Sequence, residues 1–398
     1  MYLTSRSAFQ VANVVLIWVV NAITHSALDI AIVGIANTAS TLIVTLPAGV
    51  WVDRVNRFVL LLVANIVSVA CVAFLILATN NFDLILIAVL VVIWAGAGEL
   101  YRSTSYSVLP EIVNANQLSN ANGVTQSGYQ IVSSISIVLG GILIVAIGVA
   151  LTFVFGLVGY GLAALFSGFL VFRFRKNGSL GSAPTPLKER NMIREIKEGF
   201  SWLLTQRGLL GLSLIALVTN FLDGIPIYFF VIYITETLKA GAVIYAGILA
   251  TMVAGAAAGS LIAGRIPKAL AYAGKINILV WGVSVATMLI ILGLVPEINV
   301  AFGAGLGIGL GIGFGNNIWL TSAHNLVPTE MRGRFFAIDG LLSFMGGPPS
   351  IAAGGILVAL IGISKVFLAS GILLLISAAM FSFMKSLWNL DGRPRKAG

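Results

Sequence analysis

Four acidic residues lie inside or at the edge of long apolar runs, where a carboxylate has few natural partners. They are Asp29, Glu99, Asp223 and Asp339. Asp223 belongs to the stretch Asn220-Phe-Leu-Asp223-Gly224-Ile-Pro226, in which Pro226 removes a helical N–H group. A carboxylate beside such a weakened turn is a candidate for binding a cation or relaying a proton. The alternative is a buried aspartate that is simply hydrogen-bonded.

Two neighbours extend this set of candidates. Asn220 precedes Asp223 by about one helical turn, and Arg102 follows Glu99 by about one turn. We therefore take Asp223 with Asn220 as the first candidate for proton or substrate binding, and Glu99 with Arg102 as the second. The sequence shows no nucleophile with a base, no phosphate loop, a single cysteine and two distant histidines. We expect neither an enzyme nor a metal site nor a cofactor.

The composition indicates an integral membrane protein. The chain has 398 residues, of which 59% are hydrophobic and only 9% are charged, whereas soluble domains have about 25% charged residues. Since about 20 apolar residues in a helix cross a bilayer, the sequence predicts twelve spanning helices. They cover residues 7–24, 29–50, 58–78, 84–102, 122–145, 151–172, 209–234, 242–263, 276–295, 299–322, 335–361 and 365–384.

The basic residues predict the orientation. All but Lys239 and Lys365 of the 23 lysines and arginines fall on one side of these helices, and the positive-inside rule makes that side cytoplasmic. Both termini are then cytoplasmic in a multi-pass protein of the plasma membrane. The net charge of +9 follows from this topology, so we expect membrane lipids and not nucleic acid as partners.

A charged turn joins the second and third apolar runs. Its sequence is Gly49-Val-Trp-Val-Asp53-Arg54-Val-Asn-Arg57, and we call it the elbow. Its arginines could do no more than fix the orientation of the chain. The spacing of Gly49, Asp53, Arg54 and Arg57, however, resembles the signature between helices 2 and 3 of the major facilitator superfamily.

This resemblance implies an all-α integral membrane fold of twelve helices in two six-helix bundles, working as a monomer on a small-molecule substrate. The bundles would cover residues 1–172 and 208–385, with a cytoplasmic linker at 173–207 and a cytoplasmic tail at 386–398. The superfamily packs the elbow against the start of helix 11. Asp339 could therefore pair with Arg54 or Arg57, and the elbow would act as a conformational latch.

A second stretch narrows the resemblance. The sequence from Leu109 to Asn122 is similar to the Leu-Pro, Leu-Val, Gln-Leu, Ala-Asn pattern of the macrolide-efflux and enterobactin-exporter branch. The branch implies alternating access and proton-coupled export of a drug-like, amphipathic molecule. Ser5-Arg6 stands where members often carry Gly-Asp, so an uncoupled facilitator or a lipid or metabolite transporter is the alternative. A non-transporting receptor would need larger outer loops.

Polar side chains on the apolar helices are candidates for lining a substrate cavity. In lipid they must face protein or water, so plain hydrogen bonding between helices is the alternative. These residues are Gln10, Asn13, Asn21, Gln126, Gln130, Asn316 and Asn317.

Two further patterns concern the shape of the helices. In the linker, Ile193, Ile196, Phe200, Leu203 and Leu204 predict an amphipathic helix on the inner leaflet, with a simple tether as the alternative. Glycines at every second position from 303 to 315 predict two rows on nearly opposite faces of one helix, which allow close packing on both sides.

Overall fold

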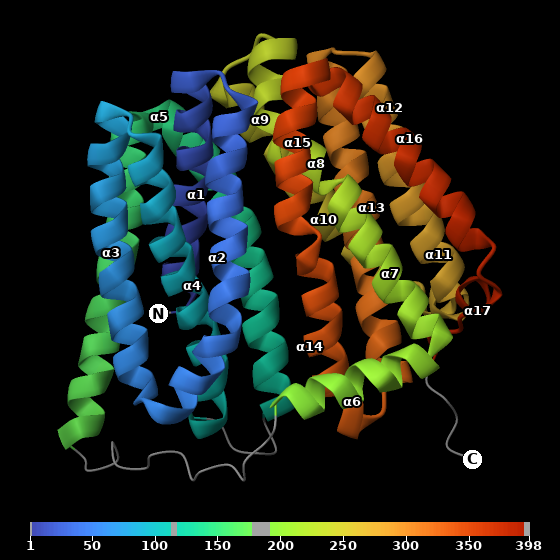
Figure 1. The fold of residues 1–398 in the computed structure, drawn as a ribbon, viewed down its shortest axis with the longest axis horizontal. Coiled ribbons are helices and arrows are strands. Elements are labelled where there is room, and N and C mark those ends of the chain that lie inside the picture. The colour runs from blue at the N-terminus through green and yellow to red at the C-terminus, as the bar shows by residue number, and fades with distance from the viewer. Residues whose placement is uncertain (1, 113–117, 177–191, 394–398) are drawn as a thin grey trace. The chain divides into compact units, whose positions relative to one another are not determined.

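The computed structural model describes residues 2–112, 118–176 and 192–393. The described part of the chain is built from helices, as expected for apolar segments whose backbone groups must be satisfied without water. It divides into two compact units, Met1–Glu189 and Arg190–Gly398, shown in blue to green and in yellow to red in Figure 1. The finer domain boundaries given above stay a prediction.

The described residues of the N-terminal unit form five helical elements. Helix α1 packs on α5, α2 packs on α4, and α3 packs on both α4 and α5. Helix α1 is longer than the predicted run, since it begins at Tyr2 and so includes Arg6. The elements are α1 (Tyr2–Thr24), α2 (Ala27–Arg54), α3 (Arg57–Asn81), α4 (Leu84–Ile112) and α5 (Leu118–Lys176).

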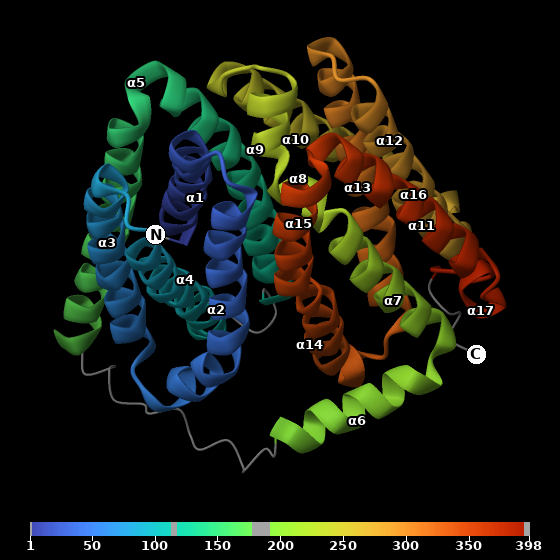
Figure 2. The same ribbon diagram turned by 45° about the horizontal axis from the view of Figure 1, so that its top comes forward.

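Helix α5 is a hairpin that supplies two of the predicted spans. Its 59 residues would measure about 88 Å if straight, nearly three times the ~30 Å apolar core of a bilayer. The chain reverses at Gly148, whose φ of 81° favours glycine. Gly140 and Gly156, on opposite arms, both pack against the Ala8–Val14 stretch of α1, and Figure 2 shows the two arms.

The C-terminal unit contains more and shorter elements, because three of its spans are interrupted. They are α6 (Met192–Thr205), α7 (Arg207–Leu222), α8 (Gly224–Tyr228), α9 (Phe230–Ile232), η3 (Tyr233–Thr237), α10 (Ala242–Gly264), η4 (Pro267–Tyr272), α11 (Ala273–Leu279), η5 (Val280–Val285), α12 (Ala286–Leu294), α13 (Ile298–Leu326), α14 (Thr329–Met345), α15 (Gly347–Ile361), α16 (Ile363–Ser382) and α17 (Lys385–Trp388).

The prediction of an all-α membrane fold is confirmed. Within the described ranges, ten stretches are long and apolar enough to cross a membrane. One of them, residues 131–173, is the α5 hairpin and covers two of the predicted apolar runs. The predicted run 209–234 follows the interrupted path from α7 to η3, so each of the twelve predicted runs coincides with helical elements.

A seam of glycines joins α10 and α13, the most extensively packed helix pair of this unit. Gly309 and Gly313 face α10 so closely that a Cβ atom would overlap the carbonyl oxygens of Met252 and Ala256. Gly307 and Gly315, on the other row, face Met288 and Trp281 of the neighbouring span. The two predicted glycine rows are therefore confirmed.

Helix α6 does not present one uniform apolar face. It meets α7 at 109°, passes beneath α14 in Figure 2, and buries Leu203 completely. Gly199 packs on Ile338, and Glu198 pairs with Arg334 of α14 at 3.3 Å. Phe200 and Leu204 remain exposed. The predicted apolar stripe is thus divided between the protein and the outside, while the side chains of residues 193 and 196 lie outside the described part.

Candidate functional site

Asp223 lies at a break in the seventh span. Helix α7 ends at Leu222 and α8 begins at Gly224. The Asp223 N–H still donates to the Thr219 carbonyl at 2.8 Å, and the Ile227 N–H donates to the Asp223 carbonyl at 3.1 Å. Pro226 has no N–H to offer the Leu222 carbonyl, so the helical ladder is interrupted between these two bonds.

The Asp223 side chain is buried, with 4% of the residue exposed. The Asp223 side chain makes no hydrogen bond that caps α8. Within the described ranges, no cationic side chain pairs with its carboxylate. Burying it in the charged form is therefore costly, and a proton or a cationic group would relieve that cost.

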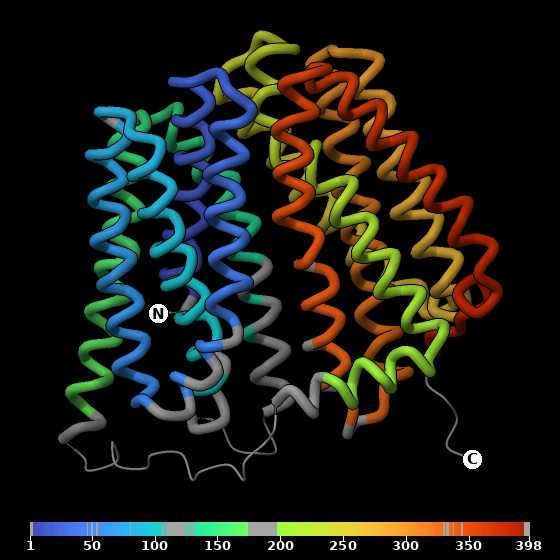
Figure 3. Tube along the Cα trace, viewed as in Figure 1, coloured from blue at the N-terminus to red at the C-terminus, as the bar shows by residue number. Residues whose placement is uncertain are grey.

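A second break lies directly beside the first. Helix α14 ends at Met345 and α15 begins at Gly347, where Pro348 and Pro349 lack N–H groups, and Figure 3 shows this offset in the orange trace. The Ser350 hydroxyl of α15 donates to the Phe221 carbonyl at 2.7 Å. Asn220 of α7 donates to the Ser343 carbonyl of α14 at 3.4 Å. Each broken span therefore contributes a side chain to the main chain of the other.

Asp339 lies in the same α14, six residues before its end at Met345. It is buried, with 3% exposed, and accepts a 2.6 Å hydrogen bond from the Ser213 hydroxyl of α7. The expected pairing of Asp339 with Arg54 or Arg57 would involve the N-terminal unit and stays a prediction. Ser213 was not predicted from the sequence, because a serine on an apolar helix gives no sign of its partner.

The N-terminal unit brings the second candidate pair together. The Arg102 guanidinium donates to both carboxylate oxygens of Glu99, at 2.8 and 2.7 Å. The Glu99 side chain is only 3% exposed, against 39% for Arg102. Thr45 of α2 and Ser103 also donate to Glu99, at 3.2 and 3.3 Å. The carboxylate is thus well supplied with donors, in contrast to Asp223.

The elbow is the boundary between two helices. Helix α2 ends at Arg54 and α3 begins at Arg57. Between them, the Asn56 side chain caps α3 by accepting hydrogen bonds from the Phe58 and Val59 N–H groups at 3.0 and 3.3 Å. Arg57 donates to the Ser107 carbonyl of α4 at 3.0 Å, which ties the elbow to that helix. The surroundings of Gly49 and the side chains of Asp53 and Arg54 lie outside the described part.

The candidate cavity residues take different positions. Asn13 accepts from Asn37 of α2 at 3.3 Å, and Asn317 donates to Ser260 of α10 at 3.2 Å, as the alternative of hydrogen bonding between helices requires. Asn21 is buried, with 1% exposed. Asn316 is exposed and Gln10 is half-buried. The side chains of residues 126 and 130 lie outside the described part.

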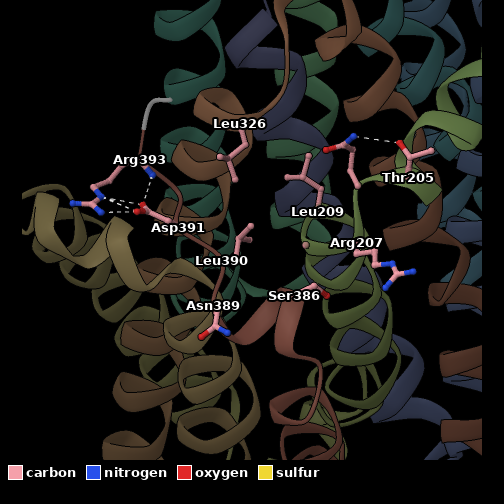
Figure 4. A pocket seen from close by; sticks show the side chains of 11 residues that line it. Thr205, Arg207, Leu209, Leu326, Ser386, Asn389, Leu390, Asp391 and Arg393 are labelled. Carbon is pink, nitrogen blue, oxygen red and sulfur yellow. Dashed lines mark hydrogen bonds and ion pairs between the residues drawn. The ribbon is translucent and has the colours of Figure 1, made fainter. Parts of the chain in front are cut away.

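A hollow of about 740 Å³ lies between the α6–α7 corner and the segment that follows α16. In Figure 4, Leu209, Leu326 and Leu390 surround it, and the Asp391–Arg393 pair lies at its edge. Hydrogen bonds from Arg393 hold the pKa of Asp391 below its usual value. No residue singled out from the sequence lines this hollow.

Comparison with known proteins adds a family and a fold. A family model described as the Major Facilitator Superfamily matches residues 1–351. An uncharacterized MFS-type transporter of Bacillus subtilis, YvqJ, is 28% identical over 169 residues, which are 42% of this chain. The match spans only 39% of that relative's length.

Solved structures resemble the chain over nearly its whole length. A bacterial homologue of the human lysosomal transporter Spinster, in an inward-facing and unoccupied conformation, has a TM-score of 0.72 at 16% identity and covers 100% of this chain and 98% of its own. The nucleoside transporter NupG reaches 0.71 at 12% identity, with 96% and 99% covered. A bacterial homologue of the iron transporter ferroportin reaches 0.67 at 15%, with 96% of each chain covered. At these identities the likeness shows the fold.

Proposed function

Because the chain belongs to the Major Facilitator Superfamily, whose members are transporters and not enzymes, we propose that it exports an amphipathic, drug-like molecule by alternating access, driven by proton entry. Membership itself makes it a multi-pass membrane protein that carries a small-molecule substrate. The expectation that the chain is not an enzyme is confirmed. Substrate, direction and coupling are the proposal.

The observation that carries the proposal is the burial of Asp223 at the break in α7. A spanning helix with a weakened ladder can change shape at that point, and a buried carboxylate there has different free energies in its charged and neutral forms. Protonation removes the charge and so biases one of two conformations. This is the minimum that coupling between proton entry and a conformational cycle requires.

The nature of the substrate rests on sequence. The pattern from Leu109 to Asn122 is typical of the macrolide-efflux and enterobactin-exporter branch, which supports an amphipathic substrate and outward transport. By their names, one protein of similar fold is a nucleoside transporter and another is a homologue of an iron transporter. Their substrates therefore give no reason to prefer a nucleoside or a metal ion here.

The location is part of the proposal. We place the protein in the plasma membrane as a monomer, with both termini in the cytoplasm, because all but two of its basic residues fall on one side of the helices. Membrane lipids would contact the exposed apolar side chains of the spanning helices. Phe200 and Leu204 of α6 would meet the inner leaflet.

One observation favours a second candidate, a facilitator of lipids or metabolites without proton coupling. Arg6 lies in α1 at the place where related proteins often carry an acid, and it donates to Ser133 of α5 at 2.7 Å. Glu99 is held by Arg102, Thr45 and Ser103. The N-terminal unit thus offers less for proton binding than Asp223 does.

Proton release separates these two functions. Purified protein in proteoliposomes that contain a pH-sensitive dye is given a macrolide such as erythromycin, with a nucleoside as a comparison compound. Antiport predicts that the macrolide displaces protons in proportion to the amount transported. Macrolide transport without any proton movement would contradict the coupled mechanism and support the facilitator.

A further inference from the structure

Two of the three interrupted spans of the C-terminal unit, α7–α8 and α14–α15, contact one another at the level of Asp223. We propose that Ser350 is a positioning residue that keeps the α7–α8 span in its broken form. Its hydroxyl donates to the main-chain carbonyl of Phe221, which in a continuous helix would accept a backbone hydrogen bond. The inference rests on the proposed function, because it assigns a role to Ser350 through Asp223. It adds a residue that carries no charge and belongs to no sequence motif.

Ser350 is itself fixed in place. The residue is completely buried and lies in the first turn of α15, where its N–H donates to the Gly346 carbonyl at 3.0 Å. Its hydroxyl donates to the Phe221 carbonyl at 2.7 Å, across 129 residues of sequence. A buried serine could satisfy its hydroxyl within its own helix. Here it reaches the neighbouring span instead.

The acceptor lies where the ladder of α7 is interrupted. In a continuous α-helix the Phe221 carbonyl would accept from the N–H of Ile225, four residues on. Phe221 lies two residues before Asp223. The bond from the Ser350 hydroxyl stabilises the form in which the Phe221 carbonyl accepts no hydrogen bond from the Ile225 N–H. Removing the hydroxyl should therefore favour the closed rung. A typical net hydrogen-bond contribution corresponds to a shift of between about 2-fold and about 12-fold in the equilibrium between the two forms.

Gly224 makes room for this arrangement. A Cβ atom on residue 224 would lie 2.9 Å from the Ser350 oxygen and 3.7 Å from its Cβ. The serine hydroxyl therefore occupies the space that a side chain at 224 would need. A methyl group at this position would displace the hydroxyl without removing it, which gives a second route to the same change.

The contact is reciprocated from the other span. Asn220, one residue before Phe221, donates to the Ser343 carbonyl in the last turn of α14, and Gly346 packs against Leu217 and Phe221. Each break is thus capped by a residue of the other span. A change of shape in α7–α8 must alter α14–α15 at the same time.

Charged groups on the packed elements do not explain a pH effect at this point. Helices α8 and α15 carry no charged residue, and α8 carries the titratable Tyr228. The other elements packed against α7 and α8 contribute Arg207 of α7, Glu330, Arg332, Arg334 and Asp339 of α14, Lys365 of α16, Arg194, Glu195, Lys197 and Glu198 of α6, Lys275 of α11 and Lys385 of α17. Asp339 bonds to Ser213, which lies about 15 Å before Asp223 along α7. Asp223 is thus the acid that Ser350 can influence.

Hydrogen exchange of the full-length protein in lipid nanodiscs tests the inference. In Ser350→Ala we expect the N–H of Ile225 to exchange between about 2-fold and about 12-fold more slowly than in the wild type, because the rung closes. Gly224→Ala should slow the same amide. Ser377→Ala is the matched control, because Ser377 bonds only to Leu374 of its own helix, and it should leave Ile225 unchanged.

A transport measurement connects the role of Ser350 in the α7–α8 break to function. If Ser350 positions Asp223, Ser350→Ala should shift the pH profile of transport, whereas Ser377→Ala should not. Unchanged exchange at Ile225 in both Ser350→Ala and Gly224→Ala would overturn the inference, whatever the transport result. Slower exchange with an unshifted pH profile would also overturn it. Amide hydrogen exchange does not depend on proton coupling. Failure of the proposed function would therefore be recognised separately, because the wild type would then transport substrate without releasing protons.

Discussion

The hydroxyl of Ser213 on α7 donates a 2.6 Å hydrogen bond to the carboxylate of Asp339 on α14, and both residues are buried. This contact joins the start of the seventh span to the start of the eleventh. The same two spans meet again at their breaks, through Ser350 and Asn220. Polar contacts at two levels therefore join these two spans.

Removing the Ser213 hydroxyl should destabilise the protein. Ser213→Ala leaves a buried carboxylate without its donor, so we expect the free energy of unfolding to fall by about 1–3 kcal/mol. Ser382→Ala removes a half-buried serine that bonds to its own helix, and should stay within about 0.5 kcal/mol. Denaturant unfolding in detergent micelles measures both. Equal losses in the two variants would show that the Ser213 contact contributes nothing particular.

The glycine seam predicts that two glycines of α13 differ sharply in how much an alanine in their place destabilises the protein. Gly309→Ala would force a methyl group onto the Met252 carbonyl, while a Cβ at Gly303 meets nothing within 4 Å. We expect Gly309→Ala to lower the free energy of unfolding by about 1–3 kcal/mol and Gly303→Ala to leave it nearly unchanged. The melting temperatures of both variants, measured side by side in detergent, check this. A tolerated Gly309→Ala would mean that α10 and α13 are not in close contact.

The sequence predicted the helices and the interruption of the seventh span. Apolar length alone located every span, because a bilayer leaves the backbone little choice, and the two-residue glycine spacing predicted the faces of α13. Gly224 and Pro226 marked the weak point of the seventh span. The turn at Gly148 also agrees with the gap between two predicted helices.

The partners that define the candidate site gave no such signal. Ser213, Ser350 and Thr45 are ordinary residues in apolar helices, and the first two bond to groups more than 120 residues away. Nothing in their local sequence distinguishes them from Ser377, which bonds within its own helix. Long-range hydrogen bonds of this kind depend on which helix faces meet, and that is a property of the fold.

The elbow should affect cycling rather than binding. Asp53 lies in the last turn of α2 and not in the middle of a span, so we expect Asp53→Asn to lower transport several-fold and to change the Kd for substrate by less than about 2-fold. Asp83→Asn is the control, because it alters an acid at the turn before α4 whose oxygen caps Leu86. Equilibrium binding and uptake are measured on the same preparations. A large loss of binding with normal cycling would assign the elbow to the substrate site.

The orientation can be read with reporter fusions. The concentration of lysines and arginines on one side predicts that fusions after Arg175 and after Gly398 both report the cytoplasm. A fusion in the turn at Asp83 should report the opposite side. An external signal from either of the first two would overturn the count of twelve spans.

The central claim is that Asp223 couples protons to transport, and Asp223→Asn tests it most directly. Asparagine resembles the neutral acid in shape, so the variant should fold and still exchange substrate across proteoliposomes at equal pH. With a pH gradient imposed, the wild type should accumulate substrate against its concentration gradient. The control variant Asp29→Asn should do the same. Asp223→Asn should only equilibrate it, with no dependence on pH. Full gradient-driven accumulation by Asp223→Asn would contradict the account and make Glu99 the acid to examine.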